Sequence, residues 1–193
     1  LAHPNICPII DMGEQAGLHY YAMEYLAGRD LADVMKTQYV SFERAADIAR
    51  QAAEALDHAH KNGIVHRDVK PHNIFLTRTD RRRAPSRRSR SRAEPTDTAL
   101  DLKLDARDLS PSPSYLDHVH LIDFGLAKMD HAGTMSRTGD IIGTPYYMAP
   151  EQALGDRALI GPGADIYSLG VVLYEMVTLR RPFQYDSIER MLS

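Results

Sequence analysis

The sequence predicts an α+β fold in which a short strand region is followed by a mainly helical region. Two features of the apolar residues support this prediction. Between Ile6 and Tyr25 they form short runs separated by turn residues, as in a strand hairpin, whereas later stretches repeat them at helical spacing. The chain has 193 residues, 44% of them hydrophobic, which is enough for one ordinary domain or two small lobes with a sizeable core.

The first predicted element is the hairpin. Its two strands contain the runs ICPII and LHYYAMEYL, and the turn-rich segment 11–17 separates them. Gly28 is expected to end the second strand, because glycine weakens a strand and marks turns.

Two helices are predicted next. Asp30 is a suitable N-cap for a short helix over 31–36, and Ser41 is a suitable N-cap for a much longer one. In the longer helix the apolar residues recur on one face, and Asn62-Gly63 is expected to end it. That helix should therefore bury one face and expose the other.

Three short β-type runs and a last helix complete the prediction. The runs are Ile64-Val65, Ile74–Leu76 and Val119–Ile122. Residues 165–178 carry apolar side chains around most of the helical circumference. A helix of this kind is expected at the centre of the fold.

The segment between Thr77 and His118 fits none of these patterns. Residues 78–92 contain eight arginines and one aspartate, a net charge of +7 in a chain whose total is −3. The residues after them are acidic with Pro-Ser repeats, so the stretch at about 80–117 is expected to be a disordered insertion, with at most a transient helix over 96–110. Such an Arg/Ser run is most often a solvated linker, although it could also bind RNA or another anionic surface.

Composition excludes several classes of protein. The one cysteine, Cys7, cannot form an internal disulfide, which favours a reducing, cytoplasmic compartment. No apolar run approaches the roughly 20 residues of a membrane helix, and no segment is typical of a signal peptide. Because the chain opens at Leu1 without a methionine and stops at Ser193 just after an apparent helix start, it is expected to be part of a longer protein.

The most informative pattern is a series of motifs. Residues 66–73 read HRDVKPHN, residues 123–125 read DFG, residues 149–151 read APE and residues 165–170 read DIYSLG. Each string alone is a weak signal. In this order and on these predicted elements, they resemble the catalytic domain of the eukaryotic-type Ser/Thr protein kinases, with a bacterial-type member as one option.

The resemblance covers nearly the whole chain apart from the insertion. It implies a protein-kinase-like α+β fold, with the end of the N-terminal lobe and the hinge strand over 1–25 and a partial, mainly helical C-terminal lobe over 26–193. It also implies an internal column of side chains that couples the two lobes. The members of that column would be Ile9, His66, Phe124 and Asp165. For Ile9, plain core packing is an equally good interpretation.

The resemblance also assigns the residues that would transfer a phosphoryl group. The reaction needs a carboxylate to position the attacking hydroxyl and accept its proton, metal ions to bridge the phosphates, and a cation on the migrating group. By resemblance Asp68 is the carboxylate and Lys70 neutralises the γ-phosphate of ATP. Asn73 and Asp123 would bind Mg²⁺, which prefers oxygen ligands of this type.

Other positions would bind the rest of ATP. By resemblance Met23 guards the back of the adenine pocket, while the Glu24 carbonyl and the Leu26 amide bind the adenine edge. Asp30 corresponds to the ribose contact, and Phe75 to the apolar floor beneath the base.

A further group of residues concerns specificity and activation. Thr144 would contact both Asp68 and Lys70, which together with Lys70 itself favours serine and threonine over tyrosine substrates. Arg67 suggests activation by a phosphate on the segment between DFG and APE, because its cation would pair with that anion. The candidate phosphosites are Thr134, Ser136 and Thr138. A merely polar loop is the alternative interpretation for at least two of them.

By resemblance, then, the chain is a fragment of a Ser/Thr protein kinase that transfers the γ-phosphate of ATP to a protein substrate with a serine or threonine acceptor. The glycine-rich loop and the strand lysine of the family would precede Leu1, so the fragment in isolation is expected to be inactive. Glu151 would likewise lack its family partner, an arginine further along the chain.

Three alternative functions stay open at this point. A catalytically silent, kinase-like binding scaffold is disfavoured, because a scaffold needs none of the four catalytic and metal-binding residues. A nucleic-acid-binding protein would depend on residues 81–92 alone. A structural zinc site at His58-x-His60 or His118-x-His120 is disfavoured, since the first pair does not share a helix face and the second has no companion ligands.

Overall fold

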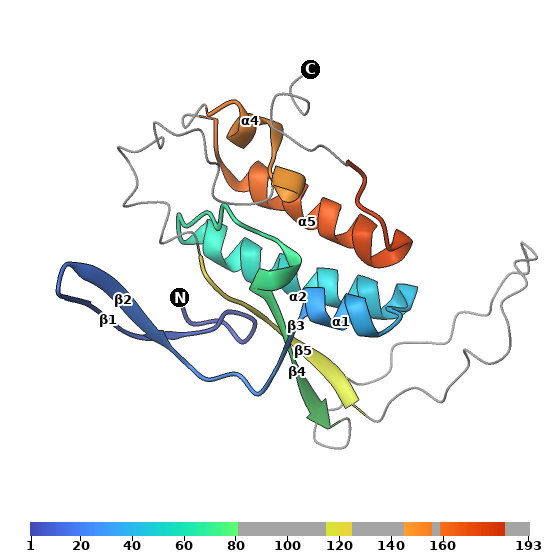
Figure 1. Ribbon diagram of the computed structural model, residues 1–193, viewed down its shortest axis with the longest axis horizontal. Helices are drawn as coiled ribbons and strands as arrows, with labels where there is room; N and C mark the ends of the chain where they lie inside the picture. The colour runs from blue at the N-terminus through green and yellow to red at the C-terminus, as the bar shows by residue number, and fades with distance from the viewer. Residues whose placement is uncertain (81–114, 125–144, 156–158, 184–193) are drawn as a thin grey trace, which may run out of the picture. The chain divides into compact units, whose positions relative to one another are not determined.

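The computed structural model describes residues 1–80, 115–124, 145–155 and 159–183. The chain divides into two compact units, one made of Leu1–Thr77 with His118–Ser193 and the other of Arg78–Asp117. The first unit contains a two-stranded sheet, the helices and most of a three-stranded sheet (Figure 1). The predicted disorder of the insertion and its transient helix lie outside the described residues.

The predicted hairpin is confirmed. Strands β1 (Ile9–Gln15) and β2 (Leu18–Met23) pair antiparallel, with Gln15 opposite Leu18. The two residues between the strands, Ala16 and Gly17, have φ values of 53° and 78°. Positive φ at both central residues is the geometry of the two-residue hairpin turn whose twist matches that of the strands, and glycine adopts it without strain.

The prediction that Gly28 ends the second strand is wrong. Strand β2 ends at Met23, and Gly28 instead begins β3 (Gly28–Asp30), which pairs antiparallel with β4 (Ile74–Asp80). A Cβ atom at Gly28 would lie 2.1 Å from the carbonyl oxygen of Leu76. Glycine is therefore needed here for the close approach of two backbones, not for a chain reversal.

The two predicted helices are confirmed with their N-caps. Helix α1 spans Leu31–Thr37, one residue more than predicted, and the Asp30 carboxylate accepts the backbone N–H of Asp33 at 2.7 Å. Helix α2 spans Phe42–Lys61, and the Ser41 hydroxyl accepts the backbone N–H of Arg44 at 3.3 Å.

The end of α2 also agrees with the prediction. Asn62 is the C-cap, and Gly63 follows with a φ of 74°, the left-handed geometry that commonly ends a helix. The strand predicted at Ile64-Val65 is wrong. The backbone N–H of Ile64 bonds back to the Ala59 carbonyl, so this residue still closes the helix end instead of joining a sheet.

The second sheet joins segments from distant parts of the sequence. Its order is β3-β4-β5, where β5 spans Tyr115–Leu121. An isolated parallel bridge pairs Ile6 with Leu121, so the segment before β1 lies along the end of β5. The core is shared by α1, α2, β4, β5 and the last helix, and its fully buried members include Leu31, Ile48, Leu56, Ile74, Leu121 and Met176.

The last helix, α5 (Pro162–Thr178), packs along α2 (Figure 1). The prediction of an all-round buried helix holds for one side only. Ile166 and Tyr174 are 54% and 48% exposed, and Gly170 between them is exposed as well. The described residues cover α5 from the α2 side and from a short turn, η2 (Pro145–Tyr147). No helix of the described part of the chain has the length and apolar character needed to cross a membrane.

Three buried polar groups tie the N-terminal segment to α2 and β5. The side-chain amide of Asn5 donates to Gln51 Oε1 at 3.1 Å and to the Val119 carbonyl at 2.8 Å. The backbone N–H of Val119 donates to the same Gln51 oxygen at 3.1 Å. Because Asn5 and Gln51 are only 5% and 7% exposed, water cannot replace these bonds.

We expect Gln51→Met to lower the free energy of unfolding by about 1–3 kcal/mol, because it keeps the volume but leaves two buried N–H donors without their acceptor. Urea unfolding of the wild-type and variant proteins measures this. Arg50→Met is the matched control one residue away. Arg50 pairs with Asp47 and Glu54 on the helix surface, so its loss should cost less than about 1 kcal/mol. Equal losses in the two variants would contradict the prediction.

Candidate active site

The HRDVKPHN segment forms a loop that gathers three predicted site residues. Lys70 Nζ lies 2.7 Å from Asp68 Oδ2. The Asn73 amide nitrogen donates to the same oxygen at 3.1 Å and to the Asp68 carbonyl at 2.9 Å. The 3-10 turn η1 (Pro71–Asn73) brings Asn73 back toward Asp68, and the buried Val69 anchors the loop between them. The Asp68 carboxylate is therefore held by two donors.

A buried carboxylate on α5 fixes the start of this loop. Asp165 accepts the backbone N–H of His66 at 2.8 Å and that of Arg67 at 2.7 Å, each on a different oxygen. His60 Nε2, from α2, lies 2.7 Å from the first of these oxygens. The Asp165 side chain is 1% exposed, so these partners replace the water that the carboxylate has lost.

Arg67 has a left-handed backbone, with a φ of 64°. This conformation is unfavourable for a side chain with a Cβ atom and persists only where neighbours enforce it. The Asp165 bond to its N–H supplies one constraint. A second comes from Gln152, whose side-chain amide donates to the Arg67 carbonyl at 2.9 Å.

His66 is held at both ring nitrogens. Nε2 lies 3.0 Å from the Ile122 carbonyl, and the backbone N–H of Asp68 donates to Nδ1 at 3.3 Å. The ring must therefore carry its proton on Nε2 and accept on Nδ1. Burial lowers the pKa of His66, which keeps the ring neutral as this pattern requires. His66 also packs on Phe124, with ring centroids 4.5 Å apart.

Asp123, the first residue of the DFG motif, follows β5 in a left-handed conformation with a φ of 57°. Its Oδ1 accepts a hydrogen bond from the Tyr21 hydroxyl of β2. This bond, with desolvation and the carboxylate charge, raises the pKa of Tyr21 to about 12, so the phenol stays protonated and acts as the donor.

The donor set fits a magnesium ion. Asn73 uses its amide nitrogen for the bonds to Asp68, so its amide oxygen remains as the group that a cation would bind. Asp123 adds a carboxylate. Mg²⁺ takes hard oxygen ligands and keeps waters and phosphate oxygens in its shell, so two side chains suffice.

The histidines considered for zinc are engaged with other groups. His60 contacts Asp165, His58 stacks on His3 at 5.0 Å, and His118 Nε2 lies 3.0 Å from the Pro4 carbonyl. Within the described ranges, no three His, Cys, Asp or Glu side chains lie together as metal ligands.

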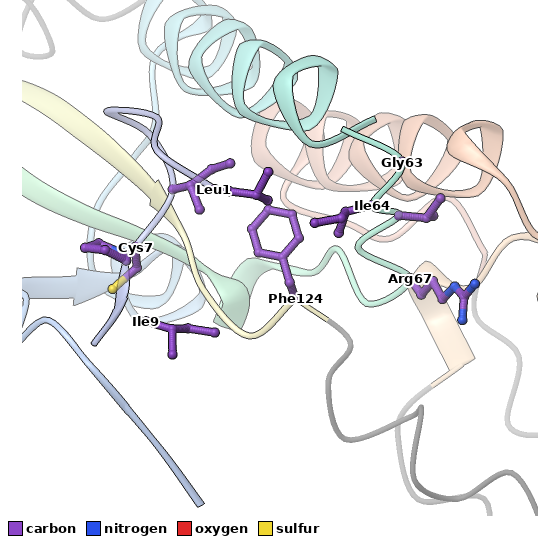
Figure 2. A pocket seen from close by; sticks show the side chains of 10 residues that line it. Leu1, Cys7, Ile9, Gly63, Ile64, Arg67 and Phe124 are labelled. Carbon is purple, nitrogen blue, oxygen red and sulfur yellow. The ribbon is translucent and has the colours of Figure 1, made fainter. Parts of the chain in front are cut away.

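An apolar pocket of about 400 Å³ adjoins Phe124. Figure 2 shows the Phe124 ring lying between Leu1 and Ile64, with Ile9 on the β1 side. Of the four residues predicted to form an internal column, Asp165 bonds the backbone of His66, and the His66 ring contacts Phe124. Ile9 lines the same pocket as Phe124 but is 43% exposed.

The predicted adenine-binding segment follows β2. Met23 is its last strand residue and is 41% exposed, Glu24 and Leu26 come after it, and the Glu24 N–H bonds the Pro8 carbonyl at 3.2 Å. Cys7 Sγ donates to the Glu24 carbonyl at 3.6 Å. The Glu24 carbonyl, which is predicted to bind adenine, thus already accepts one weak hydrogen bond. Burial raises the pKa of the Cys7 thiol, which keeps it protonated.

The predicted ribose and floor residues lie opposite each other. Asp30 pairs with Phe75 across the β3–β4 ladder. One Asp30 oxygen caps α1 through the Asp33 N–H, the structural role predicted for this residue. Phe75 is partly buried against Gly28.

Sequence reasoning missed Gln152, which lies in the short helix α4 (Pro150–Ala153). Its side-chain oxygen accepts the Ala149 N–H at 3.1 Å while its nitrogen bonds Arg67, so the APE segment is joined to the HRD loop. The only sequence signal was its position directly after APE.

A second cluster that the sequence did not reveal ties η2 to α5. The Tyr147 hydroxyl donates to Glu175 at 2.5 Å, and Arg181 Nε donates to the other Glu175 oxygen at 3.2 Å. The Arg181 guanidinium also lies over the Tyr146 ring, 4.1 Å from its centroid.

Four predicted site residues lie outside the described part of the chain: Thr134, Ser136, Thr138 and Thr144.

We expect Asp165→Asn to lower the free energy of unfolding by about 3–5 kcal/mol, because an amide NH₂ would face a backbone N–H in a site without water. Thermal and urea unfolding measure the loss. The neighbouring Ile166→Ala, on the exposed side of α5, is the control and should change stability by less than about 0.5 kcal/mol. A loss of the same size in the control would show that α5 tolerates no change here, and would refute the role given to the carboxylate.

The comparisons with known proteins agree with the motifs. A family model described as the protein kinase domain matches residues 1–192. A probable serine/threonine-protein kinase of Clostridium acetobutylicum is 35% identical over 97% of this chain and 23% of its own length. PrkC of Bacillus subtilis is 32% identical over 97% of this chain and 23% of its own length. PknA of Mycobacterium tuberculosis is 36% identical over 96% of this chain and 36% of its own length. Both are named serine/threonine-protein kinases.

Solved structures show the same fold. The PknI kinase domain of Mycobacterium tuberculosis is 26% identical, with a TM-score of 0.61 over 95% of this chain and 54% of that one. Rad53 in complex with AMP-PNP is 24% identical, with a TM-score of 0.64 over 100% of this chain and 38% of the Rad53 chain. At this identity the match supports the fold alone. The chain thus spans about a quarter to a third of the length of these curated relatives.

Proposed function

This chain belongs to the protein kinase family, since the family's domain covers residues 1–192, and on that premise we propose that the protein containing it is a Ser/Thr protein kinase. It transfers the γ-phosphate of ATP to serine or threonine hydroxyls of a protein substrate and requires Mg²⁺. The observation that carries the proposal is the cluster of Asp68, Lys70 and Asn73 in one loop, with Asp123 held at the end of β5.

Asp68 acts on the substrate hydroxyl. Its carboxylate orients the hydroxyl toward the γ-phosphorus and takes the proton as the oxygen attacks. Lys70, held 2.7 Å from the same carboxylate, places a positive charge where the migrating phosphoryl group gathers negative charge. Asn73 and Asp123 would hold the metal, which when bound would neutralise negative charge on the phosphates.

The nucleotide lies between β2 and β4. Met23 closes the back of the adenine pocket, and the Glu24 carbonyl and the Leu26 amide bind the adenine edge. Asp30 contacts the ribose with the oxygen that does not cap α1, and Phe75 lies beneath the base. Support for this part comes from the pairing of Asp30 with Phe75 across the β3–β4 ladder.

Activation depends on Arg67, which binds a phosphate on one of three candidate residues, Thr134, Ser136 and Thr138. Thr144 contacts the catalytic pair of the loop and favours serine and threonine acceptors. The compartment is the cytoplasm, in keeping with a single, buried cysteine.

In the full-length protein, we expect Asp68→Asn to lower kcat by a factor on the order of 10² to 10⁴ and to leave nucleotide affinity unchanged, because this side chain acts on the hydroxyl and not on ATP. Asp123→Asn should weaken Mg²⁺-dependent nucleotide binding as well, because it removes a metal ligand. Steady-state phosphorylation of a protein substrate and nucleotide titration separate the two effects.

Asp57→Asn is the matched control for both variants. Asp57 is an exposed carboxylate of α2 that pairs with Lys61 and belongs to neither motif. It should keep wild-type kinetics. Parental activity in Asp68→Asn or Asp123→Asn would remove the basis of the proposal.

The insertion at about 80–117 is dispensable for catalysis. Forty-nine residues separate Asn73 from Asp123, whereas two strands of about five residues with a loop of 2 to 5 need roughly 12 to 15. We expect replacement of residues 80–117 by a glycine-containing turn to leave specific activity unchanged, because a longer loop adds only about 0.6 kcal/mol of closure cost per doubling.

Activity and thermal midpoint are compared with the parent and with a control in which a Gly/Ser linker of equal length replaces the insertion. Both variants should be active. Loss of activity in both, with an intact fold, would show that the insertion contributes to the active site.

A further inference from the structure

Tyr21 contacts Asp123, one of the two residues that the proposed function assigns to Mg²⁺. It lies in β2, the second strand of the hairpin, and its hydroxyl donates to Oδ1 of Asp123 across 102 residues of sequence. None of the motifs that identify the family includes this tyrosine. Its partner is nevertheless the carboxylate that the proposed function assigns to Mg²⁺.

The contact uses one oxygen of the carboxylate. A free carboxylate can rotate about its last side-chain torsion, whereas a hydrogen bond to Oδ1 restrains that rotation and leaves Oδ2 as the oxygen for a cation. The phenol is neutral, so it orients the carboxylate without cancelling the negative charge that attracts the metal. The left-handed backbone of Asp123 restricts the same residue from the other end.

We propose that Tyr21 is a positioning residue for the metal centre: its hydroxyl fixes the Asp123 carboxylate so that Oδ2 is presented to Mg²⁺. The inference rests on the proposed function in taking Asp123 as a metal ligand. Groups that hydrogen-bond a ligating carboxylate commonly change metal affinity or activity 10- to 100-fold when they are removed. Tyr21 acts through Asp123 and does not touch the metal.

The place of Tyr21 in β2 gives this contact a second consequence. Met23 lies two residues further on, so the two side chains leave the strand on the same face. The strand that leads into the adenine-binding segment thereby also holds the metal ligand. Residues 21–23 of β2 therefore link the contact to Asp123 with the contact proposed for the adenine base.

The test is nucleotide titration of the full-length protein, by calorimetry, with AMP-PNP as the probe in the presence of Mg²⁺ and again in EDTA. Tyr21→Phe removes a single oxygen from a side chain that is 39% exposed, so the fold should be kept. We expect AMP-PNP binding in Mg²⁺ to weaken about 10- to 100-fold and binding in EDTA to stay unchanged. A purely structural role would weaken both.

Tyr20→Phe is the matched control. Tyr20 precedes Tyr21 and points to the other face of β2, where its ring lies over Gly13 of β1. It should bind AMP-PNP as the wild type does under both conditions. In the Asp123→Asn background, Tyr21→Phe should have no further effect, because the carboxylate through which it acts is gone.

Three results would overturn the inference while the protein kinase assignment stands: unchanged binding in Mg²⁺, weakening by the same factor in EDTA, or tighter binding in Mg²⁺, which would mean that the hydroxyl competes with the metal for Asp123. A wild-type protein that neither phosphorylates protein nor binds AMP-PNP in a Mg²⁺-dependent way would instead refute the proposed function, and the inference with it.

Discussion

The geometry of the HRDVKPHN loop depends on one buried carboxylate. Asp165 accepts the backbone N–H groups of His66 and Arg67, and α5 delivers it from about 100 residues further along the chain. Because α5 packs on α2, and α2 contributes His60 to the same carboxylate, the packing of two helices is transmitted to the loop backbone. The strained φ of Arg67 is maintained by this arrangement. Without this carboxylate, the bond from Gln152 to the Arg67 carbonyl would remain, but the N–H groups of His66 and Arg67 would lose their acceptor.

The elements that the sequence predicted well are those that local chemistry decides. Asp30 and Ser41 cap their helices as expected, since an N-cap bond spans only three residues. The errors arise where tertiary contacts decide. The sequence predicts a strand end at Gly28 because glycine marks turns, whereas the close approach of the Leu76 backbone is what requires glycine there. The apolar residues of α5 predicted burial on all sides, but periodicity cannot state how many neighbours a helix has.

The same distinction holds for the site. The motifs predicted that Asp68, Lys70 and Asn73 would lie together, and their closeness follows from a loop of six residues. The bonds made by Tyr21 and Gln152 could not be predicted, because each joins segments 85 or more residues apart and belongs to no motif. Sequence patterns identify reacting groups more readily than the groups that hold them in place.

The long connection between β4 and β5 has a consequence for synthesis of the chain. Thr77 bonds the His118 carbonyl across 41 residues, so Ile74 and Leu76 must wait for their neighbours Val119 and Leu121 to be made. At ribosomal speeds of about 5–20 residues per second, that interval is roughly 2–8 s. For its duration the edge of β4 that faces β5 has no strand partner on the nascent chain. The inserted length thereby opens a window for chaperone binding or misassembly that a short hairpin would not have.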